Sequence, residues 1–171
     1  TDQYDIVIDD IDDIFEKSAL INACVMNTIP VISCGGAGGI TDPTLIRTTD
    51  LSRVTGDRLM AGVRKRLRQH YGFPPGSSTL KGQKRLSKWD IETVHTLPTG
   101  TSRYSGDASM HTKLRKCDVY FGNAVYCTGT LGFIAAGLAV TRIATGSKLY
   151  PKKLGKYSRK MNLESDQTAI I

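Results

Sequence analysis

The alternation of aliphatic and helical stretches in the first 34 residues limits the fold more than any other feature of this sequence. Residues 4–10 read "YDIVIDD" and residues 28–34 read "TIPVISC", two aliphatic runs of strand length, the first ending in acids. Between them, apolar residues recur at roughly helical spacing: Ile14, Ala19, Leu20, Ala23 and Val25 or Met26. The pattern predicts a strand–helix–strand unit, whose strands pair in parallel through a right-handed crossover. We therefore expect an α/β fold.

The rest of the chain continues this alternation. The run "TLIRTTDL" predicts a short strand ending at Asp50 and Leu51, and residues 57–72 predict a helix. A further strand is expected in "WDIETVHTLP" at 89–98. The apolar stretch at 124–140 is under the ~18 residues of a confident membrane span, so we interpret it as a buried helix.

These elements indicate one domain over residues 1–145 and a polar tail over 146–171. Residues 72–88 are rich in Gly, Pro, Ser and Lys, which predicts a mobile basic loop. His70, His95 and His111 lack metal-ligand spacing and are expected in loops or at the surface.

Basic residues outnumber acidic ones, 23 to 16, giving a net charge of +7 and a pI near 9.3. This balance favours an anionic partner such as nucleic acid or a phosphate-rich ligand. The predicted helix at 57–72 carries basic side chains that could contact a nucleic-acid backbone, although a solvated helix face is the simpler explanation of them. The candidates are Arg64, Lys65, Arg66 and Arg68.

Four acids, Asp9, Asp10, Asp12 and Asp13, lie where the first strand ends and the helix begins. Carboxylates there can hold Mg²⁺ against nucleotide phosphates. Alternatively, Asp12 or Asp13 caps the helix, since Asp is a preferred N-cap residue.

Residues 33–44 read "SCGGAGGITDPT". The glycine spacing does not fit the dinucleotide fingerprint, and no Lys-Ser or Lys-Thr pair closes a Walker-type loop. We therefore expect a turn at the carboxyl end of the second strand, the edge where open α/β sheets bind ligands.

The four cysteines form no C-x-x-C pair, so neither a zinc site nor a dithiol redox motif is expected. Their pattern favours a reducing compartment. Cys117 follows Arg115 and Lys116, which would lower its pKa and make it reactive, but most lone cysteines are small core residues.

Together these stretches resemble the tRNA threonylcarbamoyladenosine dehydratases, a branch of the ubiquitin-activating-enzyme-like (ThiF/MoeB/HesA) superfamily of ATP-dependent adenylyltransferases. The resemblance runs in order over about 4–68 and 115–138. It rests on four stretches, "YDIVIDDIDD", "IPVISCGGAGGITDPTLIRTTDL", "DRLMAGVRKRLR" and "CDVYFGNAVYCTGTLGF".

The resemblance implies a Rossmann-like ThiF-type fold and a reaction that uses ATP and Mg²⁺. The carboxylate of threonylcarbamoyladenosine in tRNA is adenylated and then cyclises with loss of AMP. It also assigns site residues. Asp12 would be catalytic and face the metal and triphosphate, with Asp9 and Ile11 beside it, and Cys117 would serve a sulfur relay. The substrate wall would comprise Gly35, Gly36, Gly38, Gly39 and Asp42, with a tight turn alone as the alternative.

Partners are implied as well. The family is usually homodimeric, acts on tRNA, and is linked to cysteine-desulfurase or sulfur-acceptor proteins. A cytoplasmic location is expected, or a mitochondrial one associated with the outer membrane as in eukaryotic relatives.

Some family features are missing. The glycine-rich ATP loop, with its strand and helix, is expected upstream of Thr1, and Glu92 is the one plausible remnant of the family's Ser-Thr-Glu strand. Two alternatives therefore stay open: an adenylyltransferase acting on a ubiquitin-like sulfur carrier, and a truncated, non-catalytic tRNA-binding module. The absence of C-x-x-C pairs counts against the first.

Overall fold

The computed structural model describes residues 4–74, 88–97 and 122–146. Helices and strands alternate along them, which confirms the expected α/β class. The elements are β1 (Val7–Asp9), α1 (Ile14–Met26), β2 (Val31–Cys34), the short 3₁₀ turn η1 (Pro43–Leu45), β3 (Ile46–Asp50), the 3₁₀ turn η2 (Leu51–Arg53), α2 (Arg58–His70), β4 (Glu92–Thr96) and α3 (Val125–Thr145).

The four strands form one sheet in the order β1-β2-β4-β3. β1 pairs with β2 in parallel, with Val7 opposite Val31, which confirms the predicted strand–helix–strand unit. β4 continues the parallel part of the sheet beside β2. β3 runs antiparallel to β4, with Ile46 opposite Thr96. Residues far apart in sequence, in β2 and β4, thus become neighbours.

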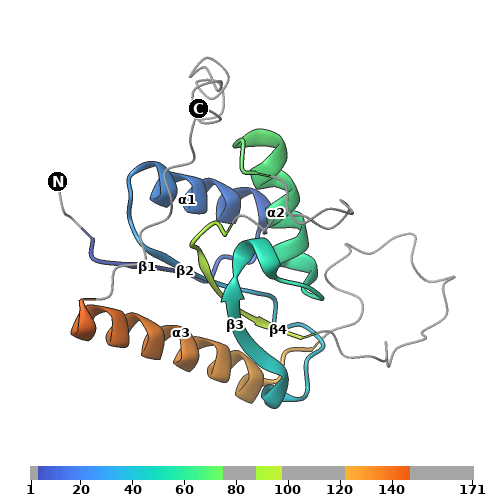
Figure 1. The fold of residues 1–171 in the computed structure, drawn as a ribbon. Coiled ribbons are helices and arrows are strands. Elements are labelled where there is room, and N and C mark those ends of the chain that lie inside the picture. The colour runs from blue at the N-terminus through green and yellow to red at the C-terminus, as the bar shows by residue number, and fades with distance from the viewer. Residues whose placement is uncertain (1–3, 75–87, 98–121, 147–171) are drawn as a thin grey trace, which may run out of the picture.

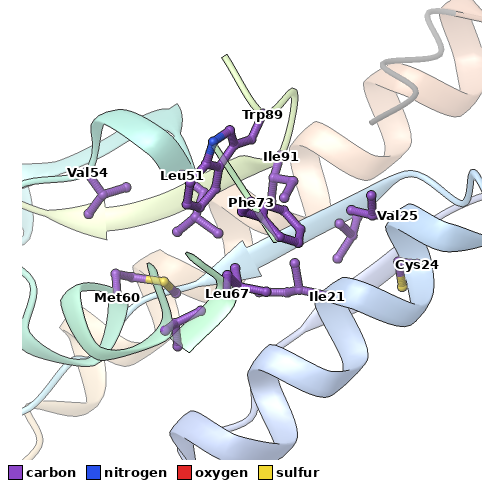
Figure 2. Packing of buried hydrophobic residues seen from close by; sticks show 12 residues of the cluster. Ile21, Cys24, Val25, Leu51, Val54, Met60, Leu67, Phe73, Trp89 and Ile91 are labelled. Atoms are coloured by element: carbon purple, nitrogen blue, oxygen red, sulfur yellow. The ribbon is translucent and has the colours of Figure 1, made fainter. Parts of the chain in front are cut away.

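Helices cover both faces of the sheet: α1 and α2 lie on one face and α3 on the other (Figure 1). The interface between the sheet and helices α1 and α2 is filled by apolar residues from α1, α2, η2 and the segment before β4 (Figure 2). Phe73 and Trp89 meet edge to face there, with ring centroids 4.9 Å apart. Buried members of this cluster include Ile21, Cys24, Val25, Leu51, Met60, Val63, Leu67 and Ile91.

The buried side of α1 matches the predicted one only in part: Val25 is buried, and Ile14 and Leu20 pack against the core, as predicted. Ala19, Ala23 and Met26 are exposed, whereas Ile21 and Cys24 are buried, together with Lys17 and Ser18. Alanine occurs on either side of a helix, so the alanine positions did not indicate which side of α1 is buried. The buried side also includes Lys17, a residue type that hydropathy assigns to solvent.

α1 and α2 approach each other closely at Gly62. A Cβ atom there would lie 2.5 Å from Cδ1 of Ile14, so the absence of a side chain lets the two helices meet. This contact joins the first turn of α1 to the middle of α2.

Two predictions around β4 need correction. His95 was expected at the surface, but it is buried in β4, with Nε2 2.9 Å from Oγ1 of Thr49 on the neighbouring strand. Phe73 was expected in the basic loop, but its ring is buried against Trp89. Residues 75–87 of that predicted loop lie outside the described residues, whereas His70 is exposed as expected.

α3 was expected to be a buried helix, and it is buried on one side only. Its buried side chains recur every four residues: Cys127, Leu131, Ala135 and Ala139. The last three pack in one cluster with Ile32, Cys34 and Val94 of the sheet. Val125 and Phe133 point outward and are 82% and 81% exposed. Hydropathy could not reveal this, because both sides of the helix are apolar.

α3 has 21 residues and extends past the apolar stretch at 124–140 to Thr145, close to the helix of about 122–144 that the sequence predicts. Within the part of the chain that the structure describes, it is a helix long and apolar enough to cross a membrane by length and composition. Core helices pass the same test, so this is weak support for a span.

Candidate functional site at the carboxyl edge of the sheet

The candidate site lies at one edge of the sheet, where the carboxyl ends of β1, β2 and β4 meet. Because β3 is antiparallel, its amino end and η1 lie at this edge too. We call it the carboxyl edge, and define it as residues 10–13 after β1, residues 35–45 after β2, Asp57 before α2 and residues 122–126 before and at the start of α3. Open α/β sheets bind ligands at such an edge.

Hydrogen bonds bring these segments together from distant parts of the chain. The amide of Gly36 donates to Oδ2 of Asp57 at 3.0 Å. The amide of Gly39 donates to the carbonyl of Gly122 at 3.3 Å, and the hydroxyl of Tyr126 donates to the carbonyl of Thr41 at 3.1 Å. The start of α3 is therefore attached to the glycine-rich turn.

The four acids after β1 have different surroundings. Asp13 is the N-cap of α1, and its Oδ1 accepts from the amides of Phe15 at 2.6 Å and Glu16 at 3.3 Å. The pKa of Asp13 is lowered, first by a hydrogen bond with the Glu16 side chain and then by the bond from the Phe15 amide. The capping alternative therefore holds for Asp13, not for Asp12.

Asp12 is exposed, and within the described residues no hydrogen bond or ion pair engages its carboxylate. It lies three residues after the end of β1, at the carboxyl edge; its contact with metal and triphosphate stays a prediction. Asp10 is exposed at the same turn.

Asp9 and Ile11 do not face a ligand in the way expected. The Asp9 side chain is buried, and its Oδ2 lies 3.0 Å from Nζ of Lys17 and accepts from the Ser33 hydroxyl at 2.6 Å. Its Oδ1 accepts from the amide of Ile11 at 3.1 Å, and the Ile11 carbonyl accepts from Lys17 at 2.9 Å. Asp9 therefore supports the loop from beneath, because its carboxylate oxygens are already engaged.

The exposed carboxylate of Asp12 suits Mg²⁺. This ion prefers one or two carboxylates combined with phosphate oxygens and water, so a single protein carboxylate at a ligand edge is enough. Among residues 4–74, 88–97 and 122–146, no group of three His, Cys, Asp or Glu side chains could hold a metal by itself.

The glycine-rich turn has two parts. Gly35 and Gly36 are engaged internally: the Gly35 amide donates to the Val94 carbonyl at 2.8 Å, and Gly36 contacts Asp57. A Cβ atom at Gly35 would lie 2.0 Å from Oδ2 of Asp57, so close backbone packing requires glycine there.

Gly38 and Gly39 are exposed at the carboxyl edge, and Gly39 has a positive φ of 75°. Asp42 caps η1, accepting from the Thr44 amide at 2.9 Å and its hydroxyl at 2.5 Å. The Thr44 hydroxyl and amide lower the pKa of Asp42. The second half of the turn is thus the half that could contact a substrate.

Most of the predicted tRNA-binding side chains are engaged within the protein. Lys65 is exposed. Arg64 donates to the Val54 carbonyl, and burial lowers the pKa of the Arg64 guanidinium. The guanidinium of Arg66 lies 4.1 Å from the ring centre of Phe15. Arg68 donates from Nε to the Arg64 carbonyl at 3.0 Å. Three of the four side chains therefore have contacts within the protein.

Two further candidates lie elsewhere. Glu92 is at the opposite end of β4, where it forms an ion pair with Arg142 and ties α3 to the sheet. Cys117 lies outside the described residues. Cys24, Cys34 and Cys127 are buried free thiols, and burial raises the pKa of each.

Sequence reasoning missed Lys17 and Asp57. Asp57 stands directly before a periodic helix, so its capping role could have been found from that position. Lys17 had no such signal, since lysine is almost never fully buried unless paired.

Comparisons with known proteins support the same interpretation. No family model matches the chain. It is 38% identical over 145 residues to the tRNA threonylcarbamoyladenosine dehydratase of Haemophilus influenzae, covering 82% of this chain and 51% of that protein.

Solved structures agree. The Escherichia coli tRNA N6-threonylcarbamoyladenosine dehydratase in complex with AMP matches with a TM-score of 0.64 and 32% identity, over 84% of this chain and 50% of that one. Its complex with ATP matches with a TM-score of 0.62 and 31% identity, over 84% and 49%. The chain thus spans about half the length of the relatives it matches. It has a partial ThiF-like fold, and its resemblance to the tRNA threonylcarbamoyladenosine dehydratases is confirmed over most of its length.

Proposed function

We propose that the protein carrying this chain catalyses the ATP-dependent dehydration of threonylcarbamoyladenosine in tRNA. The observation that carries the proposal is the exposed Asp12 carboxylate at the carboxyl edge, in a fold that resembles AMP-bound and ATP-bound structures of a dehydratase acting on this nucleoside. The chain contributes one wall of the site.

The proposed chemistry removes one water in two steps. A carboxylate oxygen of the nucleoside attacks the α-phosphate of ATP, and pyrophosphate leaves. An atom of the carbamoyl group then attacks the activated carboxyl carbon and loses its proton, which closes a ring within the same nucleoside, and AMP leaves with the former carboxylate oxygen. Adenylation is needed because a bare carboxylate oxygen is a poor leaving group.

Residues of this chain have separate roles in that scheme. Asp12 would hold Mg²⁺, which neutralises phosphate charge when bound. Gly38 and Gly39 would let the substrate approach the backbone, and Asp42 keeps the turn in place by capping η1. Lys65 is the candidate for tRNA phosphate contact, because its side chain is exposed.

Several expectations rest on the resemblance alone and stay predictions. They are the homodimer, the sulfur-relay role of Cys117 with a sulfur-acceptor partner, and the cytoplasmic or mitochondrial location.

The test uses the protein produced from its complete reading frame. It is incubated with ATP, Mg²⁺ and tRNA that carries threonylcarbamoyladenosine, and the nucleosides are analysed by mass spectrometry. We expect the modified nucleoside to lose the mass of one water, with one AMP released per event. AMP release that requires a ubiquitin-like carrier instead would favour a carrier adenylyltransferase, and tRNA binding with neither event would favour a non-catalytic module.

A further inference from the structure

Lys17 is a buried cation for which the proposed chemistry has no direct use. Its side chain is 0% exposed, so it cannot touch ATP or tRNA. It lies in the first turns of α1, directly behind the loop that carries Asp12. A buried lysine requires a specific partner, because an unpaired charge in the interior is strongly disfavoured.

The partners of Lys17 belong to the end of β1 and the start of that loop. Nζ lies 3.0 Å from Oδ2 of Asp9, whose side chain is also 0% exposed. It donates to the carbonyl of Ile11 at 2.9 Å and approaches the carbonyl of Asp9 at 3.5 Å. Ser33 on β2 completes the group by donating to Asp9 at 2.6 Å.

This group fixes the backbone on the near side of Asp12. Both the amide and the carbonyl of Ile11 are bonded, to Asp9 and Lys17 respectively. On the far side, Asp13 is fixed by its bonds to the first amides of α1. Asp12 thus has a backbone held at both neighbours and a carboxylate that is exposed.

We infer that Lys17 is a positioning residue: through Asp9 and Ile11 it holds the loop so that the Asp12 carboxylate meets Mg²⁺ and the nucleotide phosphates. The inference rests on the proposed function, since it assigns the metal to Asp12. It separates two tasks among neighbouring acids, with Asp9 paired in the interior and Asp12 presented at the carboxyl edge.

The test measures, by calorimetry, the ATP affinity of the protein produced from its complete reading frame, once with Mg²⁺ and once with EDTA. The unchanged protein should bind ATP more tightly when Mg²⁺ is present. In Lys17→Met, the factor by which Mg²⁺ increases the affinity for ATP should fall about tenfold, as it does when residues that support metal ligands are replaced. The affinity for ATP without metal should stay unchanged. A purely structural role would lower both affinities together.

A double variant guards against misfolding. Lys17→Met alone leaves the Asp9 charge buried without its partner, which can prevent folding. Asp9→Asn with Lys17→Met removes both charges; the asparagine oxygen can still accept from the Ile11 amide, and its NH2 group, in the place of Oδ2, can donate to the Ser33 hydroxyl. This variant should fold and show the same reduced gain. Lys88→Met, which removes an exposed lysine, is the control for net charge and should keep the full gain.

Amide hydrogen exchange of the unchanged protein supplies a measurement that needs no variant. The Ile11 amide should be protected before nucleotide is added, because Asp9 accepts its hydrogen. Exchange as fast as in an unstructured peptide would overturn the inference. A folded double variant in which Mg²⁺ still tightens ATP binding by the full factor would also overturn the inference. If the unchanged protein nevertheless dehydrates the tRNA nucleoside, only the positioning role of Lys17 fails, and the proposed function stands.

Discussion

Gly35 shows how one absent side chain can set the geometry of the carboxyl edge. The turn after β2 passes so close to α2 that Asp57 can both cap the helix and accept from Gly36. The Asp57 carboxylate is itself buried, so these backbone amides provide its compensation.

Replacing Gly35 by alanine should therefore be costly. Its Cβ would lie 2.0 Å from Oδ2 of Asp57 and 3.2 Å from Cβ of His95, and we expect a loss of about 2 kcal/mol in the free energy of unfolding. Gly36→Ala is the matched control, because its Cβ would have only an ordinary contact of 3.8 Å with Leu59. Urea denaturation measures both. Equal effects at the two positions would show that the turn does not pack as described.

Cys34 gives a pH-dependent prediction at the residue scale. Burial, with a smaller contribution from Asp10, raises the pKa of its thiol from 9.0 to about 11. Between these values the unfolded chain releases the proton and the folded chain keeps it, so ionisation favours unfolding. The stability that this thiol preserves below pH 9 should be lost as the pH rises toward 11. Denaturation at pH 8 and pH 10.5 should show a steeper decline for the unchanged protein than for Cys34→Ala; parallel declines would contradict a raised pKa.

At the scale of elements, the strands were predictable, but the buried sides of α1 and α3 were predictable only in part. Short runs of β-branched and aliphatic residues identified β1, β2, β3 and β4, because such runs favour a strand over other secondary structure. The antiparallel direction of β3 had no local signal, since it depends on pairing with β4. The buried side of α1 was assigned only in part, because alanine is found equally on either side of a helix and Lys17 lies on the buried side. Nothing in the order of residues shows that a lysine will meet an aspartate eight positions earlier.

The glycines of α3 allow a test of this helix. A Cβ at Gly137 would meet no atom within 4 Å, so Gly137→Ala should raise the free energy of unfolding by about 0.5–1 kcal/mol through helix propensity. Gly146 ends the helix with a φ of 63°, and Gly146→Ala should lower the same quantity by about 1 kcal/mol. Thermal and urea unfolding would both reveal the opposite signs. Stabilisation by both substitutions would place the end of the helix elsewhere.

At the scale of the whole molecule, three layers stack: α1 with α2, the sheet, and α3. The third layer is held by one side of α3 only. Leu131 is 3% exposed against the sheet, whereas Phe133 two residues later is 81% exposed. Leu131→Ala should therefore cost about 2–5 kcal/mol in unfolding free energy, and Phe133→Ala less than about 0.5 kcal/mol. If Phe133→Ala were the more damaging change, that face of α3 would be the packed one.

The carboxyl edge is where the layers, the turn and the free carboxylate come together, and the proposed function depends on it. The sequence located Asp12 and the glycine-rich turn there, because both follow strands of one parallel unit. It did not distinguish the buried Asp9 from the exposed Asp12, since burial is set by Lys17 and Ser33 packing from α1 and β2.

The most direct test compares Asp12→Asn with Asp10→Asn in the protein produced from its complete reading frame. Each change removes one exposed negative charge from the same turn. The rate at which threonylcarbamoyladenosine in tRNA loses one water, followed by mass spectrometry, should fall by about 100-fold in Asp12→Asn. It should stay near that of the unchanged protein in Asp10→Asn. Equal rates for the two variants would contradict the assignment of Asp12 as the metal-facing carboxylate of this site.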